Sequence, residues 1–297
     1  MTPEELLDQA RRGDLAPLDQ DRAALADAVR AFARVGDAAS ALELAARTWR
    51  TWLSHGELDA GSSAMAAALT APGAETAPVW RARTLYADGL FAFRSGDRRR
   101  SWERNQEALT FARTTNDARG ECDALTGLAR IALRDGEYGE VIELAMRARE
   151  RARAAGDLEA EASPLHLQAA GVRLQGQFHA ARELYMESLD LNNALGNAAR
   201  LPTEQHNLGW VELHLGNIDA AERRFRERDT HAGADAYGDA WSDINWSAVA
   251  SARGQWEEAK RRFALGMHGL ESLGIALDPD DQSEVDWLSS RLAAVEC

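Results

Sequence analysis

Residues 156–216 decide the fold of this chain, and they read GDLEAEASPLHLQAAGVRLQGQFHAARELYMESLDLNNALGNAARLPTEQHNLGWVELHLG. Two glycine signals alternate in this stretch. A Gly followed by Asp or Asn occurs at Gly156 and Gly196, and a lone Gly after an apolar run occurs at Gly176 and Gly216. Each signal returns after 40 residues. A fixed period of this size is typical of stacked helical hairpins, so we expect an all-α solenoid.

The same two signals extend along most of the chain. A glycine in the left-handed conformation ends a helix, and Asp or Asn just before the next helix caps its amino end. The candidate hairpin glycines are Gly56, Gly96, Gly136, Gly176, Gly216 and Gly254, and the candidate caps between hairpins are Asp37, Asp117, Asp157 and Asn197. Residue 77 is Ala inside APGAETAPVW, where the turn must differ. We therefore predict six helical hairpins over residues 38–274.

Both ends of the array differ from the repeats. Thr2 and Glu5 have the spacing of a capping box, and a second helix is expected from about residue 21 to residue 34. Asp278 opens a last helix in which Trp287, Leu288 and Leu292 can cover the final repeat. Because an open stack needs caps, we predict capping helices over residues 1–37 and 275–297 of one continuous domain.

Composition and charge exclude several classes of protein. The chain has a formal net charge of −14 and a pI near 5.0, so it lacks the basic footprint of a nucleic-acid or anionic-membrane binder. Cys122 and Cys297 are too few for a disulfide framework. The start has no signal-peptide pattern, and no apolar run is long enough to span a membrane. These features predict a cytoplasmic protein.

Residues 207–225, NLGWVELHLGNIDAAERRF, resemble a tetratricopeptide repeat. Leu208, Gly209, Gly216, Ala220 or Ala221, and Phe225 match that family's pattern of Leu-Gly in the first helix, Gly at the hairpin, and a small residue then an aromatic in the second. The usual unit has about 34 residues, and the longer unit here resembles repeats that follow the ATPase module of bacterial LuxR-type regulators. Residues 44–69 are similar to the segment that opens that region. This chain has no Gly-x-x-x-x-Gly-Lys-[Ser/Thr] loop and no room for a helix-turn-helix domain. The resemblance therefore implies a right-handed superhelix that acts as a sensing or docking module.

The resemblance also implies that the first helix of each hairpin lines the concave face. That face is expected to be rich in Arg, His and aromatic side chains. The candidate binding residues are Tyr86, Arg130, Arg134, His166, Arg173, His206, Asn207, Trp210, His214, Trp241 and Asn245. Arginines bind carboxylate or phosphate bidentately, and aromatic rings supply rigid apolar contact. We expect a groove for a peptide, a protein segment or a small anionic ligand, although arginines on helices are also often solvated or paired with acidic neighbours.

Two pairs of these candidates have more than one interpretation. His166 and His206 lie one repeat apart and could flank one ligand, but that spacing is loose for a shared metal and no third ligand is evident, so neither metal nor cofactor is expected. Asn207 and Asn245 stand where some family members hold a peptide's terminal carboxylate. The flanking Lys or Arg of that clamp is missing, so these side chains could instead bond to a neighbouring helix.

Two further patterns in the carboxyl-terminal part are interpreted structurally. Trp241, Trp246, Trp256 and Trp287 are expected mostly in the core under the cap, with an aromatic wall of the groove as the alternative. The acidic run that begins at Asp278 is a weak calcium look-alike and is better explained by helix capping.

The leading functional hypothesis is a non-enzymatic, cytoplasmic binding module of bacterial regulation or complex assembly. An alternative is a small-molecule enzyme that uses His166, His206 and His214 near Glu204 and Glu212 for acid–base chemistry. A second alternative is a structural homo-oligomer. A peptide binder tolerates a shallow groove, whereas a small-molecule site needs a closed pocket and an oligomer needs an exposed apolar patch.

Overall fold

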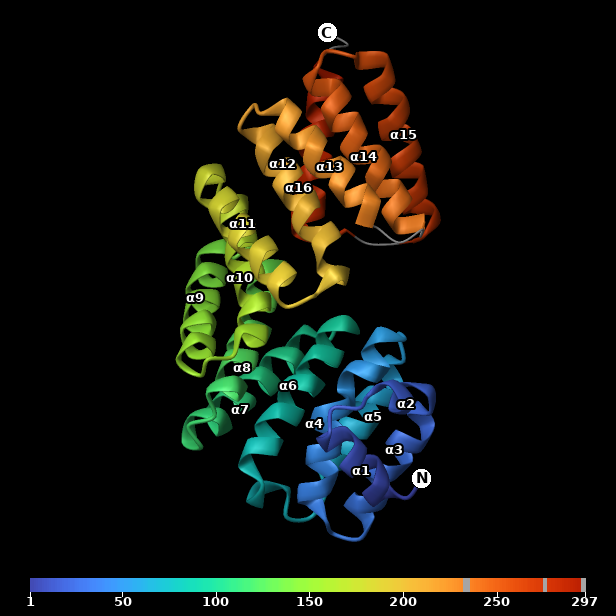
Figure 1. The fold of residues 1–297 in the computed structure, drawn as a ribbon, viewed down its shortest axis with the longest axis vertical. Coiled ribbons are helices and arrows are strands. Elements are labelled where there is room, and N and C mark those ends of the chain that lie inside the picture. Colours follow the sequence, from blue (N-terminus) through green and yellow to red (C-terminus); the bar gives the residue numbers. More distant parts are fainter. Residues whose placement is uncertain (232–235, 275–276, 295–297) are drawn as a thin grey trace. The chain divides into compact units, whose positions relative to one another are not determined.

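The structure is a computed structural model that describes residues 1–231, 236–274 and 277–294. Over these ranges every regular element is helical (Figure 1), which confirms the all-α prediction. Two elements are short 3-10 helices, η1 (Ala74–Thr76) and η2 (Ala198–Arg200), and the others are α-helices. None of the helices in these ranges is long and apolar enough to cross a membrane.

The hairpin helices follow the predicted order (Figure 1), and a short helix at Ala16–Gln20 precedes them that the sequence did not predict. Three precede the hairpins: α1 (Pro3–Arg11), α2 (Ala16–Gln20) and α3 (Arg22–Arg34). The first helices of the hairpins are α4 (Ala38–Ser54), α6 (Pro78–Arg94), α8 (Ala118–Arg134), α10 (Leu158–Leu174), α12 (Leu201–His214) and α14 (Ala236–Ala252). The second helices are α5 (Leu58–Leu69), α7 (Arg98–Thr114), α9 (Tyr138–Ala154), α11 (Phe178–Ala194), α13 (Ile218–His231) and α15 (Trp256–Ser272). The last helix is α16 (Pro279–Ala293).

The predicted hairpin glycines all have the left-handed backbone that ends a helix. Their φ angles lie between +69° and +80°. Gly156 and Gly196 have the same conformation between hairpins, and Asn116, with a φ of 52°, takes the equivalent place one period earlier. Asn is the side chain that tolerates this conformation best after Gly. The glycine pattern therefore marks both kinds of turn.

The predicted helix caps are confirmed at several junctions and wrong at one. The capping box of Thr2 is present, and Asp37 and Asp157 accept hydrogen bonds from the third backbone N–H beyond them, over 3.1 and 2.9 Å. Asn197 makes no capping bond, because its amide donates to Asn192 Oδ1 (3.2 Å) and the 3-10 turn η2 follows it. The turn near residue 77 does differ, since Gly73 and η1 lead into α6 there.

Close packing explains the residues that carry the repeat pattern. Gly209 of α12 faces the ring of Phe225 on α13, and a Cβ at residue 209 would lie 2.3 Å from that ring. Leu208, Ala221 and Phe225 are fully buried beside it. Only a residue without a side chain allows the two helices to approach this closely. The Leu-Gly pair, the small residue and the aromatic are therefore parts of one contact.

The chain divides into two compact units. Unit 1 comprises residues 1–131 and 147–160, and unit 2 comprises residues 132–146 and 161–297, so that α8, α9 and α10 contribute to both. One apolar cluster of unit 2 lies around Tyr185 and Leu208, and a second joins Trp210, Phe225 and Trp241 to Leu288 of α16. The division of the chain into two caps and six repeats stays a prediction.

Candidate functional site

Helix α16 lies beside α12 and α14 (Figure 1), and its side chains contact residues far from it in sequence. Its contacts with charged and polar side chains pair Asp278 with Arg134, Asp280 and Glu284 with Arg173, Glu284 with His206, Asp281 with Tyr237, and Arg291 with Ser251. These partners come from α8, α10, α12 and α14. We call the surface formed by Arg134, Arg173, His206, Trp210, His214 and Trp241 the inner face of unit 2.

The contacts of α16 extend the role that the sequence predicts for it. Leu288 and Leu292 are buried in the cluster around Trp210 and Trp241, so the prediction that this helix covers the final repeat is confirmed. The helix also reaches Arg173 and Arg134, which lie two and three repeats before the final one. Asp278 stands at the amino end of this helix, as predicted, but its side chain makes no capping bond, and its carboxylate lies 3.5 Å from the Arg134 guanidinium.

The carboxylate of Glu284 is the centre of this contact and is almost fully buried. One oxygen accepts a hydrogen bond from Nη1 of Arg173, and the other lies 2.9 Å from Nε2 of His206. Arg173 is itself only 4% exposed. Burial alone would lower the pKa of Arg173, but Tyr185, Glu284 and Asp280 together raise it, so the guanidinium stays charged. A buried carboxylate needs such partners, since an unpaired one is strongly unfavourable.

A chain of hydrogen bonds fixes the proton on His206. The indole N–H of Trp210 can only donate, and it donates to Oδ1 of Asn245 over 2.8 Å. The amide nitrogen of Asn245 then faces Nδ1 of His206 at 3.2 Å, so Nδ1 accepts and the ring proton lies on Nε2. Nε2 is therefore the atom that donates to Glu284. Asn245 therefore hydrogen-bonds to the neighbouring helix α12, as the alternative to a carboxylate clamp predicts.

Aromatic rings form the other half of the contact. The ring of Trp287 on α16 meets Trp210 edge to face at 5.7 Å and His214 at 5.1 Å between centroids. His214 also stacks on Phe178 at 4.2 Å, and burial lowers its pKa, with the nearby Arg173 adding to this effect. Trp210 is buried beneath these groups. Of the predicted Trp cluster, Trp241 is buried, and Trp246, Trp256 and Trp287 are partly buried against the same apolar core, in keeping with a mostly structural role.

Carboxylates gather near His206, contrary to the expectation that no further metal-ligand type lies there. Ligand atoms of His206, Asp281 and Glu284 lie within 4.8 Å of one another. Burial, with the charges of Asp280 and Glu284, raises the pKa of Asp281 to about 8. A cation at this place would meet the proton on Nε2 and the charge of Arg173, so the trio fits a hydrogen-bonded contact better than a metal.

His166 and Asn207 also have partners within unit 2. Nδ1 of His166 lies 3.0 Å from Glu204, which accepts a second hydrogen bond from Ser188. Burial opposes a charge on His166, but Glu204 outweighs it and raises the histidine pKa. The Asn207 amide donates to the Thr203 carbonyl of its own helix over 3.0 Å. Whether a ligand meets any of these side chains stays a prediction.

Two of the predicted binding residues lie in unit 1. Arg130 donates to the hydroxyl of Tyr86 over 3.1 Å, and the buried Tyr86 ring packs edge to face against Trp49 at 6.0 Å. The guanidinium of Arg50 lies 4.3 Å from the centre of the Trp49 ring. These residues form a cation–aromatic cluster in unit 1.

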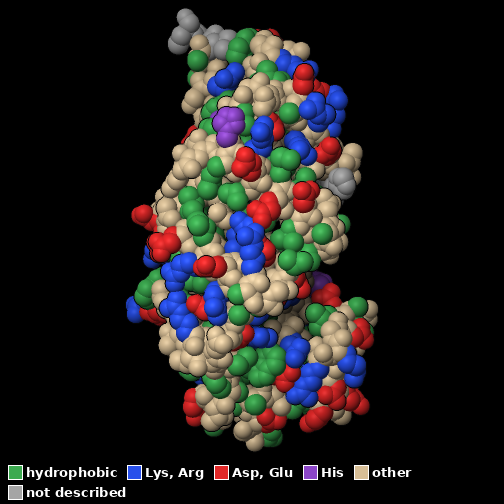
Figure 2. Space-filling model, turned by 60° about the vertical axis from the view of Figure 1, so that its left-hand side comes forward, with side chains coloured by type: hydrophobic (Ala, Val, Ile, Leu, Met, Phe, Trp, Pro, Cys, Tyr) green, Lys and Arg blue, Asp and Glu red, His purple; other side chains and the backbone are tan. Residues whose placement is uncertain are grey.

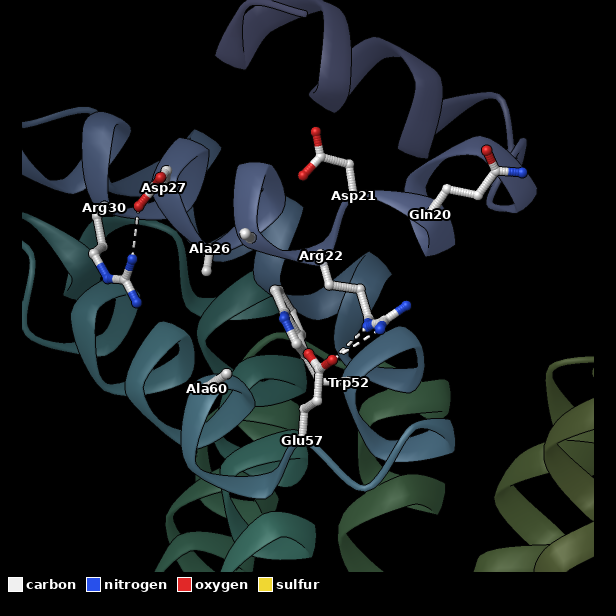
Figure 3. Close-up of a pocket in the computed structure, with 10 residues that line it drawn as sticks. Gln20, Asp21, Arg22, Ala26, Asp27, Arg30, Trp52, Glu57 and Ala60 are labelled. Atoms are coloured by element: carbon white, nitrogen blue, oxygen red, sulfur yellow. Dashed lines mark hydrogen bonds and ion pairs between the residues drawn. The ribbon is translucent and has the colours of Figure 1, made fainter.

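A separate pocket of about 410 Å³ lies in unit 1 (Figure 3). Trp52, Arg22 and Glu57 point toward its centre, and Nε and Nη2 of Arg22 donate to Glu57 at 2.9 and 2.8 Å. The indole N–H of Trp52 is buried without a hydrogen-bond partner. None of the residues predicted to bind a ligand lines this pocket. Since Arg22 is paired with Glu57 and Arg30 with Asp27, the pocket offers no strong anion site.

The surface charge is mixed. On the face shown in Figure 2, basic and acidic side chains alternate without a large area of one sign. Among the described residues, the exposed large apolar side chains of the second helices include Trp102, Met146 and Met186. Apolar side chains exposed singly are normal on soluble proteins and do not by themselves indicate an oligomer interface.

Sequence reasoning missed the residues that meet the inner face of unit 2. These residues, Asp280, Asp281 and Glu284, come from the predicted cap, in which the sequence indicated only Trp287, Leu288 and Leu292 as contact residues. One signal could have found them. The last helix is acidic and amphipathic, whereas the first helices of the hairpins carry basic and aromatic residues at the positions that recur with the repeat. Such complementary patterns within one chain indicate that the two surfaces meet.

Comparisons with known proteins identify relatives by structure alone. No protein-family profile and no curated protein matches the sequence. Among solved structures, the Rap protein complexed with competence and sporulation factor is 13% identical, with a TM-score of 0.58 over 93% of this chain and 89% of that one. PilF of Pseudomonas aeruginosa is 14% identical, with a TM-score of 0.55 over 89% and 98%. A putative kinesin light chain of Podosopora anserina with TPR-like repeats is 16% identical, with a TM-score of 0.52 over 66% and 97%.

These likenesses are too low in identity to transfer a function, and the comparison with LuxR-type regulators stays a prediction. They agree with the helical hairpins, the left-handed glycines and the Gly209–Phe225 contact. The described part of the chain has the all-α, tetratricopeptide-like fold of stacked helical hairpins.

Proposed function

We propose that this protein is a binding module that holds a segment of another protein on the inner face of unit 2. The observation that supports the proposal most is the seating of α16 on that face through ion pairs, hydrogen bonds and ring contacts. A surface that accepts one helix by side-chain contacts has the chemistry to accept a similar segment from a partner. Rap, which has a similar fold, was solved as a complex.

The alternatives have less support. A small-molecule enzyme needs a closed pocket with a few convergent polar groups, and the candidate acid–base residues His206 and His214 are instead in contact with α16. A small anionic ligand would have to compete with the carboxylates that already meet Arg134 and Arg173. A protein segment brings several contacts at once and competes more effectively.

Affinity capture from the native cytosol followed by cross-linking tests the proposal. The full chain is compared with Arg134→Glu, which reverses the charge of a side chain that is 37% exposed on the inner face. The matched control is Arg99→Glu, whose side chain is 88% exposed on α7 of unit 1. We expect a captured protein that cross-links to α10, α12 or α14, that the Arg134→Glu variant loses, and that the control retains.

Two results would contradict the proposal. One is a captured protein whose cross-links all lie outside unit 2. The other is a co-purifying small molecule that is chemically converted and lost in the Arg134→Glu variant, which would favour the enzyme alternative. Metabolite analysis of the same eluate gives the second readout.

A further inference from the structure

We propose that α16 is an exchangeable self-ligand: the inner face of unit 2 binds an acidic, tryptophan-bearing helix of a partner protein in exchange for α16. This inference rests on the proposed function and adds to it the class of partner and the way in which the site is controlled. The contacts that α16 makes define what the partner must present.

The spacing of the acidic and aromatic residues along α16 indicates which residues a partner helix needs. Asp280 and Glu284 are separated by one helical turn and both meet Arg173. Trp287 follows Glu284 by three residues and meets Trp210 and His214. A partner helix with two carboxylates one turn apart and an aromatic residue three positions later would reproduce these contacts.

The polarity of the contact is what a replaceable helix requires. Val285, Leu288 and Leu292 give α16 an apolar anchor, but a buried ion pair such as the one at its centre is often no more stabilising than apolar residues of similar volume. Here the central residue of α16 is the carboxylate of Glu284, and the acidic Asp280 and Asp281 lie close to it. An ion pair gives specificity for one arrangement rather than a large gain in stability, which suits exchange between two similar helices.

The shape of α16 also suits exchange. It is a single helix of 15 residues with an exposed outer side that includes Gln282, Ser283, Asp286 and Ser289. Its fully buried apolar anchor is Leu288, with Val285 and Leu292 almost as buried. A helix with one anchoring face and one polar face can leave the protein without exposing a second apolar surface of its own.

Binding of a synthetic peptide tests the inference on the full chain. The probe is a fluorescently labelled peptide with the sequence of residues 278–294, DPDDQSEVDWLSSRLAA, measured by fluorescence anisotropy. The release variant carries Glu284→Gln and Trp287→Ala, which weaken α16 in the chain but leave the inner face intact. We expect the peptide to bind the release variant at least about tenfold more tightly than it binds the unaltered chain.

Two controls define specificity. A peptide carrying Glu284→Lys and Trp287→Ala should bind neither protein, and adding Arg173→Gln to the release variant should abolish binding of the original peptide. Circular dichroism and a thermal melt establish that each variant is folded. Should the release variant fail to fold, Asp278→Lys with Asp280→Lys weakens the solvent-facing end of α16 without altering its buried anchors.

The outcomes separate this inference from the proposed function. Equal peptide binding by the unaltered chain and a folded release variant would mean that α16 does not block the face, which overturns the self-ligand while the binding module stands. No binding to any folded variant would mean that α16 is a fixed cap and would also overturn the inference. Cross-links of a native partner outside unit 2 would remove the proposed function whatever the peptide does.

Discussion

Arg173 and Glu284 are the two residues on which the inner face of unit 2 depends most. Both side chains are at most 4% exposed, and each supplies the charge that makes burial of the other tolerable. We predict that Arg173→Ala lowers the free energy of unfolding by about 3–5 kcal/mol, because it leaves the Glu284 carboxylate without its main partner. Chemical denaturation of the full chain measures this change.

The double variant Arg173→Met with Glu284→Leu is the control for this prediction. Removing both charges at once eliminates the unpaired carboxylate, so most of the lost stability should return. If Arg173→Ala instead lowers the free energy of unfolding by less than about 1 kcal/mol, the effect is that of an exposed ion pair. The contact between Arg173 and Glu284 would then not be buried in solution.

Gly176 gives a second prediction at the residue scale. Its φ is +76°, and a Cβ added there would meet nothing within 4 Å, so a substitution acts through the backbone alone. We predict that Gly176→Val destabilises the protein by about 1–2 kcal/mol. Gly176→Asn should cost less, because Asn enters the left-handed region more readily. Equal melting temperatures for the two variants would contradict this explanation of the turn.

At the level of elements, the docking of α16 is expected to depend on pH through Asp281. This carboxyl faces Asp280 and Glu284 on its own helix, Tyr237 on α14, His206 on α12 and Arg173 on α10. Its pKa is about 8 when α16 is docked, whereas a released carboxyl titrates near 3.9. The docked state therefore holds a proton that the released state lacks, and docking should weaken as the pH rises from about 4 to about 8.

Thermal melts between pH 5 and pH 8 check this dependence. Other groups also titrate in this range, so the quantity to follow is the difference between the unaltered chain and Asp281→Asn. We predict that the variant becomes the more stable of the two as the pH rises, because its amide needs no proton. A difference that stays constant across the range would show that Asp281 does not titrate on docking.

The sequence predicts those elements whose ends are set by neighbouring residues in the chain. The hairpin helices and their ends follow from glycines that stop helices and from capping residues, and these signals act within a few positions of the chain. The inner-face residues Arg173, His206 and Trp210 also follow from the repeat period. Their partners could not be predicted, since Glu284 meets Arg173 across 111 residues and no periodic signal links a cap to a repeat.

At the level of the whole molecule, the acidic charge and the scattered exposed apolar residues bear on self-association. With α16 docked, Trp210 and Trp241 are buried. We predict that the Glu284→Gln, Trp287→Ala variant exposes them and associates at high concentration, whereas the unaltered chain does so less. Light scattering of both proteins measures the effect, and addition of the unlabelled 278–294 peptide should reverse it. Association that the peptide leaves unchanged would point to another apolar surface.

Hydrogen exchange of the unaltered full chain tests the central claim most directly. If α16 is an exchangeable occupant of the inner face, its amides should exchange through an opening of lower free energy than those of α10, α12 and α14. Addition of excess 278–294 peptide should then speed exchange in α16 while the three inner helices stay protected. If α16 exchanges only together with α14, and the peptide does not change its rate, then α16 is an integral part of the core. That result would contradict the claim that α16 is an exchangeable occupant of the inner face.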